Sequence, residues 1–223
     1  MKLLGHTGNM SSFGPAAKQG QRRLWLVRHG ESTWNVLGLV QGHMAAPALT
    51  PRGFEQARRC ARLLAGKPIC AIASSDLQRA AQTALPIGRA LHLPVSHDGR
   101  LRERSLGSAE GTPLAALGPD QLGIADGRVV DADAAPAGGE TVRQFYARLA
   151  ACVNELLSDH PVGDLVIVCH GGVVRVVLAW LDGTGPDEME WPDVTNGMVV
   201  DRPAPSPALV APSVHYSDLG GEQ

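Results

Sequence analysis

Two short apolar runs, each leading to a histidine that precedes a glycine, constrain the fold of this chain most strongly. Residues 24–27 (LWLV) continue into residues 28–30 (RHG), and residues 165–168 (LVIV) lead through a cysteine into residues 170–172 (HGG). Unbroken apolar runs of this length are typical of strands that are buried on both faces of a parallel sheet. We therefore expect a sheet that is covered by helices on both sides.

Segments with the periodicity of amphipathic helices separate these runs. Thr50 and Pro51 suit the N-cap and the first position of a helix, and Thr141 with Gln144 forms a capping-box pattern that opens a longer one. The first of these helices has apolar residues at spacings of three and four, namely Phe54, Ala57, Ala61 and Leu64.

Further elements complete an alternating pattern of strands and helices. We expect strands at residues 69–74 and 95–97, a helix capped by Ser74, Ser75 or Asp76, and a last helix at residues 173–181. Strands that alternate with helices predict an α/β fold with a mostly parallel sheet between helical layers.

The 223 residues show no change in composition that would separate two hydrophobic cores. We expect one domain at residues 24–201, in which residues 104–140 cover the site. A flexible lead-in at residues 1–23 and an irregular, proline-rich tail at residues 202–223 would flank it. We find no apolar run that is long enough for a signal peptide or a membrane span.

Charge and cysteine content restrict the partners and the compartment. The formal net charge is −2, from 20 Lys and Arg against 22 Asp and Glu. This balance predicts no nucleic-acid partner and no membrane partner. The four cysteines form no C-x-x-C pair, so we expect buried free thiols in a cytoplasmic protein. The sequence leaves a homodimer open.

The predicted strand ends carry groups that suit a phosphoryl ligand. Ligands of parallel sheets bind beyond the carboxyl ends of the strands, where this chain places Arg28 and His29, Arg79 and His170. Arginine offers forked donors to phosphate oxygens. Gly171, at the start of a helix, lets backbone N–H groups approach an anion. These residues predict a compact positive pocket.

In such a pocket a histidine can attack phosphorus. Two arginine charges and a second histidine would lower the pKa of His29 below its usual value of about 6.5, which leaves it neutral and nucleophilic. Arg28, Arg79 and His170 would stabilise the transition-state charge. For the proton donor to the leaving alcohol we favour Glu103, with Glu110 as the second candidate.

Two other functions use the same residues. A metallohydrolase could use the two histidines with a carboxylate, but the nearby arginines would repel a cation, so we predict no metal site. A phosphate-binding module without catalysis is disfavoured, because all the chemical groups that the reaction needs are present.

The motifs together resemble the histidine phosphatase superfamily, which includes cofactor-dependent phosphoglycerate mutases, α-ribazole phosphatases and broad-specificity phosphatases. The resemblance extends over residues 24–200 and is carried by RHGESTWN (28–35), QG (41–42), LTPRGFEQA (49–57), SSDLQRAAQTA (74–84), LRERSLGSAEG (101–111), GGET (138–141) and VIVCHGG (166–172).

The resemblance implies a three-layer α/β/α sandwich and a metal-independent reaction that needs no cofactor. It implies that His29 is phosphorylated, that Arg28, Arg79 and His170 bind the phosphoryl group, and that Glu103 is the acid–base carboxylate. By the same match, Asn35 and Gly42 line the phosphate site and Gln41 lies beside them.

Within this family the sequence favours a phosphatase over a mutase. Mutases carry a long insertion after the acid–base glutamate, with cations that hold the glycerate. After Glu103 this chain has Arg104 and then no cation until Arg128. Water should therefore take the phosphoryl group. Because residues 112–137 are largely apolar, we expect a small phosphomonoester with an apolar or modest leaving group as the substrate.

Overall fold

The computed structural model describes residues 21–205. Its five-stranded sheet has the order β3-β2-β6-β1-β7. The strands are β1 (Arg23–Arg28), β2 (Ile69–Ser74), β3 (Val95–His97), β6 (Asp164–Cys169) and β7 (Val199–Pro203). Strands β1, β2, β3 and β6 pair in parallel, whereas β7 pairs with β1 in the antiparallel direction.

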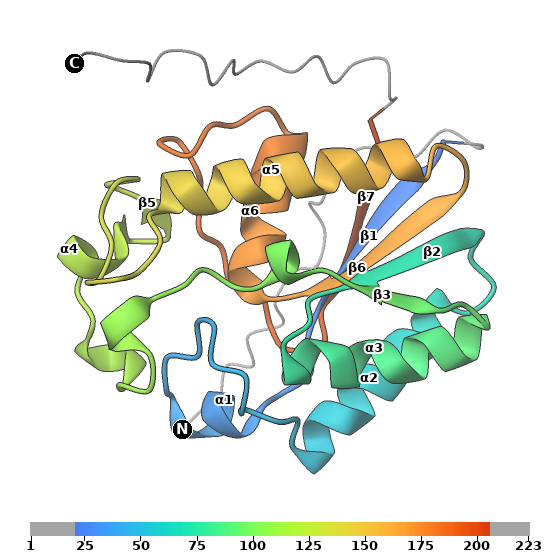
Figure 1. Cartoon of the computed structure of the whole chain (residues 1–223), viewed down its shortest axis with the longest axis horizontal. Coiled ribbons are helices and arrows are strands. Elements are labelled where there is room, and N and C mark those ends of the chain that lie inside the picture. The colour runs from blue at the N-terminus through green and yellow to red at the C-terminus, as the bar shows by residue number, and fades with distance from the viewer. Residues whose placement is uncertain (1–20, 206–223) are drawn as a thin grey trace, which may run out of the picture.

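Helices cover both faces of this sheet (Figure 1). The long helices are α2 (Pro51–Leu64), α3 (Gln78–Leu91), α5 (Val142–Asp159) and α6 (Gly171–Leu181). Helices α2 and α3 lie on one face, and α5 and α6 lie on the other. The expected three-layer α/β/α sandwich with a mostly parallel sheet is confirmed.

Alternation of side chains along β6 produces the two cores. All six residues of β6 are buried. Val166 and Val168 pack with α2 and α3, whereas Leu165, Ile167 and Cys169 pack with α5 and α6. A strand that is buried on both faces has no polar alternation, which explains the unbroken apolar run in the sequence.

Several boundaries differ from the expectations. We expected Ser74, Ser75 or Asp76 to cap helix α3. Its N-cap is Leu77, which makes no side-chain cap. Ser75 Oγ accepts a 3.3 Å hydrogen bond from the Leu77 N–H but does not cap the helix. Helix α6 begins at Gly171, two residues earlier than expected. Phe54 is 36% exposed, because the buried face of α2 is shifted toward Gly53 and Cys60.

Strand β7 was not expected, and its last two residues belong to the segment that we predicted to be irregular. The rest of that tail, and residues 1–20, lie outside the described residues. Of the four cysteines, Cys70 is exposed while the other three are buried, which corrects the expectation for that residue. Within residues 21–205 no helix combines the length and the hydrophobicity of a membrane span.

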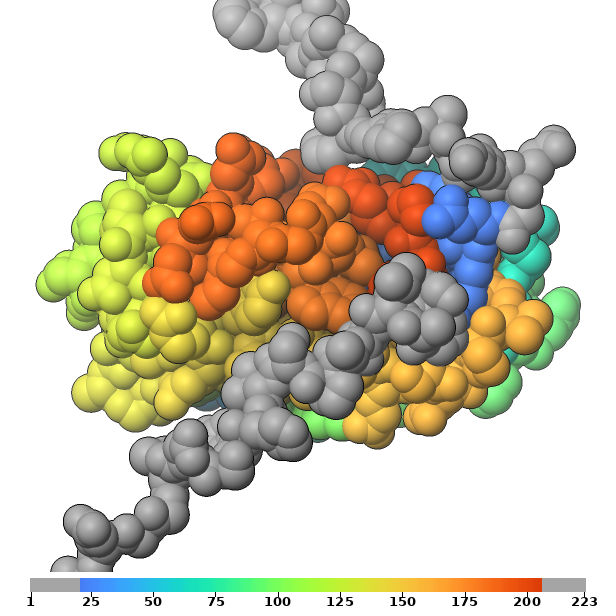
Figure 2. All heavy atoms as spheres, turned by 90° about the horizontal axis from the view of Figure 1, so that it is seen from above, coloured from blue at the N-terminus to red at the C-terminus, as the bar shows by residue number. Residues whose placement is uncertain are grey.

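A separate region lies at one end of the molecule, between β3 and α5 in sequence. It contains α4 (Pro119–Leu122) and a hairpin of β4 (Ile124–Ala125) and β5 (Arg128–Val129). Figure 1 shows it beyond the ends of the central strands, in yellow-green. Figure 2 shows the same yellow-green residues at one end of the molecule. A short helix, α1 (Thr33–Leu37), follows β1.

Candidate active site

Adjacent strand ends bring His29 and His170 together. Strands β1 and β6 are parallel neighbours, with Arg28 opposite Cys169, so the residues that follow them meet at the same edge of the sheet. The two imidazole ring centroids are 5.2 Å apart. His29 is 3% exposed and His170 is fully buried.

Hydrogen bonding selects one tautomer of His29. Its Nδ1 lies 2.7 Å from the Gly30 carbonyl oxygen, which can only accept, so Nδ1 carries the proton. The lone pair is therefore on Nε2. His29 lines a cavity of about 230 Å³, and Nε2 is the ring nitrogen available to a ligand there.

Burial is the main reason why His29 stays neutral. Desolvation lowers its pKa well below the usual value, and the charges of Arg79 and then Arg28 lower it further. The pKa of His170 is also well below its usual value, through burial first and the charge of Arg79 second. The expectation attributed this shift to the neighbouring charges alone and missed the larger cause.

Arg79 points from the first turn of α3 toward the loop at residues 41–44. It is 1% exposed, and it donates to the Gly42 carbonyl at 2.8 Å and to the Met44 carbonyl at 2.9 Å. Burial lowers the pKa of Arg79 to about 10, so the guanidinium remains charged at neutral pH. Arg28 donates from Nη1 to the Val194 carbonyl.

Three buried nitrogens around His29 have no hydrogen-bond partner within residues 21–205: Arg28 Nε, Arg79 Nε and His170 Nδ1. His170 Nε2 lies 2.8 Å from Ser75 Oγ. That hydroxyl accepts the Leu77 N–H and also has a proton to donate. When that proton goes to Nε2, the imidazole proton of His170 is on Nδ1. Buried donors without an acceptor are rare and unfavourable. Arg28 and Arg79 line the cavity beside His29, whereas the fully buried His170 does not. An anion in the cavity is the acceptor that the two arginine donors lack.

The two candidate proton donors occupy different places. Glu103 lines the cavity, and its carboxylate accepts 2.9 Å and 3.0 Å hydrogen bonds from the backbone N–H groups of Gly172 and Arg104. Glu110 does not line the cavity, and its Oε1 accepts from the backbone N–H groups of His43 and Leu106. The geometry therefore favours Glu103.

The remaining predicted residues fall into two groups. Asn35, Gln41 and Gly42 line the same cavity as His29. Gly42 has φ of +43° and lies against Glu110, so a Cβ would be both strained and crowded there. Gly171 lies beneath the side chains of Arg28 and Arg175 and does not line the cavity.

Sequence reasoning missed Arg175 and Trp191, which also line the cavity. The Arg175 guanidinium lies 5.0 Å from the centre of the Trp191 ring, and its Nε donates to the Pro192 carbonyl at 2.6 Å. The signal was a single charged residue in an otherwise apolar helix. It also missed Asn196, whose amide donates to the His29 carbonyl at 3.2 Å.

The region at the end of the sheet supplies the apolar wall of the cavity. Its contributing residues are Leu106, Leu114, Leu122 and Ile124. Arg104 holds this region together, because its guanidinium donates to the carbonyls of Leu122, Ala134 and Glu140. Arg104 therefore has a structural role, and it also lines the cavity. Within residues 21–205, no group of three or more histidine, cysteine and acidic side chains could bind a metal ion.

We expect the two buried histidines to make the protein less stable in acid. Each is neutral in the folded state and regains a pKa near 6.5 on unfolding, so the unfolded state binds more protons as the pH falls below about 6.5. Each should then lower the free energy of unfolding by about 1.4 kcal/mol per pH unit.

Urea unfolding between pH 7 and pH 5 tests this expectation. The slope of the free energy of unfolding against pH should be smaller in His170→Gln by about one proton, or about 1.4 kcal/mol per pH unit. His97→Gln, which changes an exposed histidine, should leave this slope unchanged. Equal slopes in all three proteins would contradict the assignment of neutral buried histidines.

Comparison with known proteins assigns the chain to a family. The family model described as the histidine phosphatase superfamily (branch 1) matches residues 24–201. A glucosyl-3-phosphoglycerate phosphatase of Mycobacterium tuberculosis is 36% identical over 168 residues, which cover 72% of this chain and 75% of the relative. A probable phosphoglycerate mutase of Yersinia enterocolitica is 33% identical and covers 74% and 76%.

The solved structure of a mycobacterial glucosyl-3-phosphoglycerate phosphatase in complex with VO3 has a TM-score of 0.70 and 32% identity to this chain. The two structures superpose over 81% of this chain and 90% of the phosphatase chain.

Proposed function

Because the chain belongs to branch 1 of the histidine phosphatase superfamily, we propose that it hydrolyses small phosphomonoesters through a phosphohistidine on His29. The observation that carries this proposal is the neutral imidazole of His29, which lies among three buried donors that lack an acceptor. These donors match a phosphoryl group in charge and in hydrogen-bonding capacity.

The reaction would proceed in two balanced steps. His29 Nε2 attacks phosphorus, the N–P bond forms, and the bond to the leaving oxygen breaks while Glu103 donates a proton to that oxygen. Water then attacks the phosphohistidine, the P–O bond forms as the N–P bond breaks, Glu103 takes the water proton, and inorganic phosphate leaves neutral His29 behind. Arg28, Arg79 and His170 stabilise the negative charge on the equatorial oxygens in both steps.

The proposed substrate class follows from the one lining residue of α6 that carries a charge. The expectation of an apolar or modest leaving group did not include Arg175, which lines the cavity and is half-buried. We propose that the substrate is a phosphorylated hydroxy acid whose carboxylate binds Arg175. The M. tuberculosis relative, named for a phosphoglycerate derivative, supports this class.

Arg175→Met is expected to lower kcat/KM for 3-phosphoglycerate about 10- to 100-fold, because a charge-assisted hydrogen bond contributes about 1.5–3 kcal/mol. Hydrolysis of p-nitrophenyl phosphate, which has no carboxylate, should change less than about threefold. Arg62→Met, a change of an exposed arginine in α2, is the control. A uniform loss on both substrates would remove the carboxylate site from the proposal.

We also expect hydrolysis and not isomerisation. A mutase must hold the dephosphorylated acid while it reorients and must exclude water. The guanidinium of Arg104 is fixed by bonds to three carbonyls, so we expect Arg175 to hold the acid. One guanidinium is a weak restraint on reorientation. With 3-phosphoglycerate and catalytic 2,3-bisphosphoglycerate, in EDTA, inorganic phosphate should form and 2-phosphoglycerate should not.

Two outcomes of this assay would overturn parts of the proposal. Formation of 2-phosphoglycerate faster than release of phosphate, measured by coupling to enolase, would make the protein a mutase. Loss of activity in EDTA that zinc or magnesium restores would favour a metallohydrolase.

The cytoplasm is the compartment that we propose, which the four free cysteines support.

A further inference from the structure

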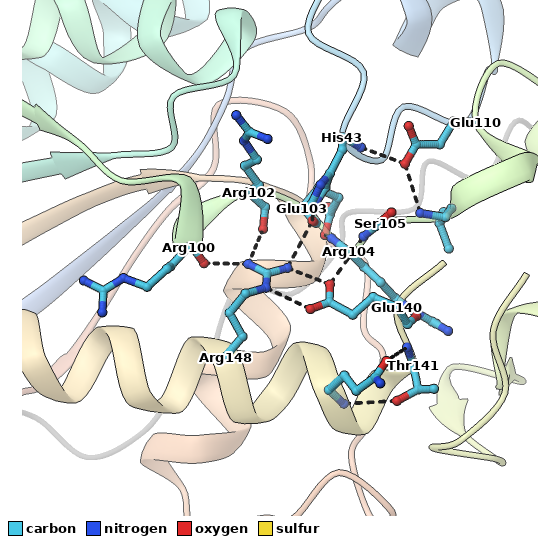
Figure 3. A network of polar contacts seen from close by, with 12 residues as sticks. His43, Arg100, Arg102, Glu103, Arg104, Ser105, Glu110, Glu140, Thr141 and Arg148 are labelled. Atoms are coloured by element: carbon cyan, nitrogen blue, oxygen red, sulfur yellow. Dashed lines mark hydrogen bonds and ion pairs between the residues drawn. The ribbon is translucent and has the colours of Figure 1, made fainter. Parts of the chain in front are cut away.

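The guanidinium of Arg148 in α5 has an acceptor for each of its five N–H groups (Figure 3). Nε and Nη2 donate to the two carboxylate oxygens of Glu140 at 2.8 Å and 2.7 Å. Nη1 donates to the carbonyls of Arg100 and Arg102 at 2.5 Å and 3.2 Å, and Nη2 donates to the carbonyl of Glu103 at 3.3 Å. One side chain therefore fastens the segment that ends at the proposed proton donor.

Other contacts of Glu103 leave its backbone little freedom. The His43 ring lies with Nε2 2.8 Å from the Glu103 carbonyl, so this carbonyl accepts from both His43 and Arg148. The carboxylate of the same residue is held by the N–H groups of Gly172 and Arg104. The position of the carboxylate is thus set from both ends of the residue.

Arg148 is itself fixed in place. Its guanidinium lies 5.0 Å from the centre of the buried Phe145 ring. The side chains of Arg148 and Glu140 are 21% and 16% exposed, so solvent competes only weakly for the pair. The fork that reaches three carbonyls and a carboxylate is planar, and lysine, with three N–H donors on one nitrogen, cannot reproduce it.

We propose that Arg148, held by Glu140, is a positioning residue that sets the distance between the Glu103 carboxyl group and the leaving oxygen. The inference rests on the proposed function, in which Glu103 supplies the proton. Proton transfer requires heavy atoms about 2.6–3.2 Å apart, and a displacement of about 1 Å can slow a reaction about 100-fold. Neither Arg148 nor Glu140 lines the cavity, so their effect passes through Glu103.

The test compares two substrates in variants of Arg148. In Arg148→Gln and Arg148→Lys, kcat for glycerol phosphate, whose alkoxide leaving group needs a proton, should fall about 10- to 100-fold. The kcat for p-nitrophenyl phosphate should change less than about threefold. Arg148→Gln added to Glu103→Gln should cause no further loss on glycerol phosphate, since residues that act through one group are not additive.

Arg143→Gln is a matched control on the same helix. Arg143 forms two bidentate ion pairs, with Asp133 and Asp187, but makes no contact with residues 100–103 that the structure shows. This change should leave the ratio of kcat for glycerol phosphate to kcat for p-nitrophenyl phosphate unaltered. If Arg148→Gln does not fold, as judged by thermal unfolding, Glu140→Gln takes its place.

Equal losses on both substrates, or full additivity with Glu103→Gln, would overturn the positioning role. Failure of the proposed function would give a different result. Either the unaltered protein would have no phosphatase activity, or the His29→Ala variant would retain its activity.

Discussion

His29→Ala is expected to lower kcat for phosphomonoester hydrolysis by about four orders of magnitude or more, the scale on which covalent catalysis depends on its nucleophile. The variant keeps Arg28, Arg79 and His170, so phosphate should still bind. Without the imidazole of residue 29 no phosphohistidine can form, so water must attack the substrate directly. Initial rates with p-nitrophenyl phosphate, together with vanadate affinity, separate the loss of chemistry from the loss of binding.

His97→Ala is the control for this variant, because His97 is exposed at the end of β3. It should retain the full rate. A His29→Ala protein that keeps more than a few per cent of the original kcat would falsify the assignment of the nucleophile.

Glu103→Gln should show the second large effect, and its size should depend on the leaving group. An alkyl phosphate such as glycerol phosphate is expected to lose a factor of about 10² to 10⁴, because its alkoxide needs a proton in the transition state. The p-nitrophenolate ion leaves without such help, so that substrate should lose less than about tenfold. A plot of log kcat against leaving-group pKa should be steeper in the variant.

Glu110→Gln is the matched control, since its Oε1 accepts from two backbone N–H groups and the glutamine oxygen can do the same. It should slow both substrates little and equally. If Glu103→Gln slowed both substrates equally and Glu110→Gln gave the steep dependence, the two glutamates would exchange roles.

The sheet was predictable from sequence where strands are buried on both faces. Residues 24–27 and 165–168 are apolar without interruption because neighbours pack into different cores, as Val166 and Ile167 do in β6. Strand β7 was not predictable in this way. It is an antiparallel edge strand with partly exposed residues, including Asp201 and Pro203, so it has no apolar run, and proline is tolerated there.

The candidate site was predictable in part for the same reason. Parallel strand ends meet, so the structure places His29 and His170 side by side. Arg28 and Arg79 line the same cavity as His29. Arg175 was not found because a residue one helical turn after Gly171 reaches the cavity only through the packing of α6 on the sheet. Distinguishing Glu103 from Glu110 likewise required their backbone partners.

The proposed intermediate can be observed directly. Enzyme that is rapidly quenched in alkali during turnover of radiolabelled substrate should carry phosphate that is stable in alkali and lost in acid, and peptide mapping should place it on His29. Labelled phosphate on another residue would contradict catalysis through His29, as would none with a substrate that phosphorylates the enzyme faster than the intermediate is hydrolysed.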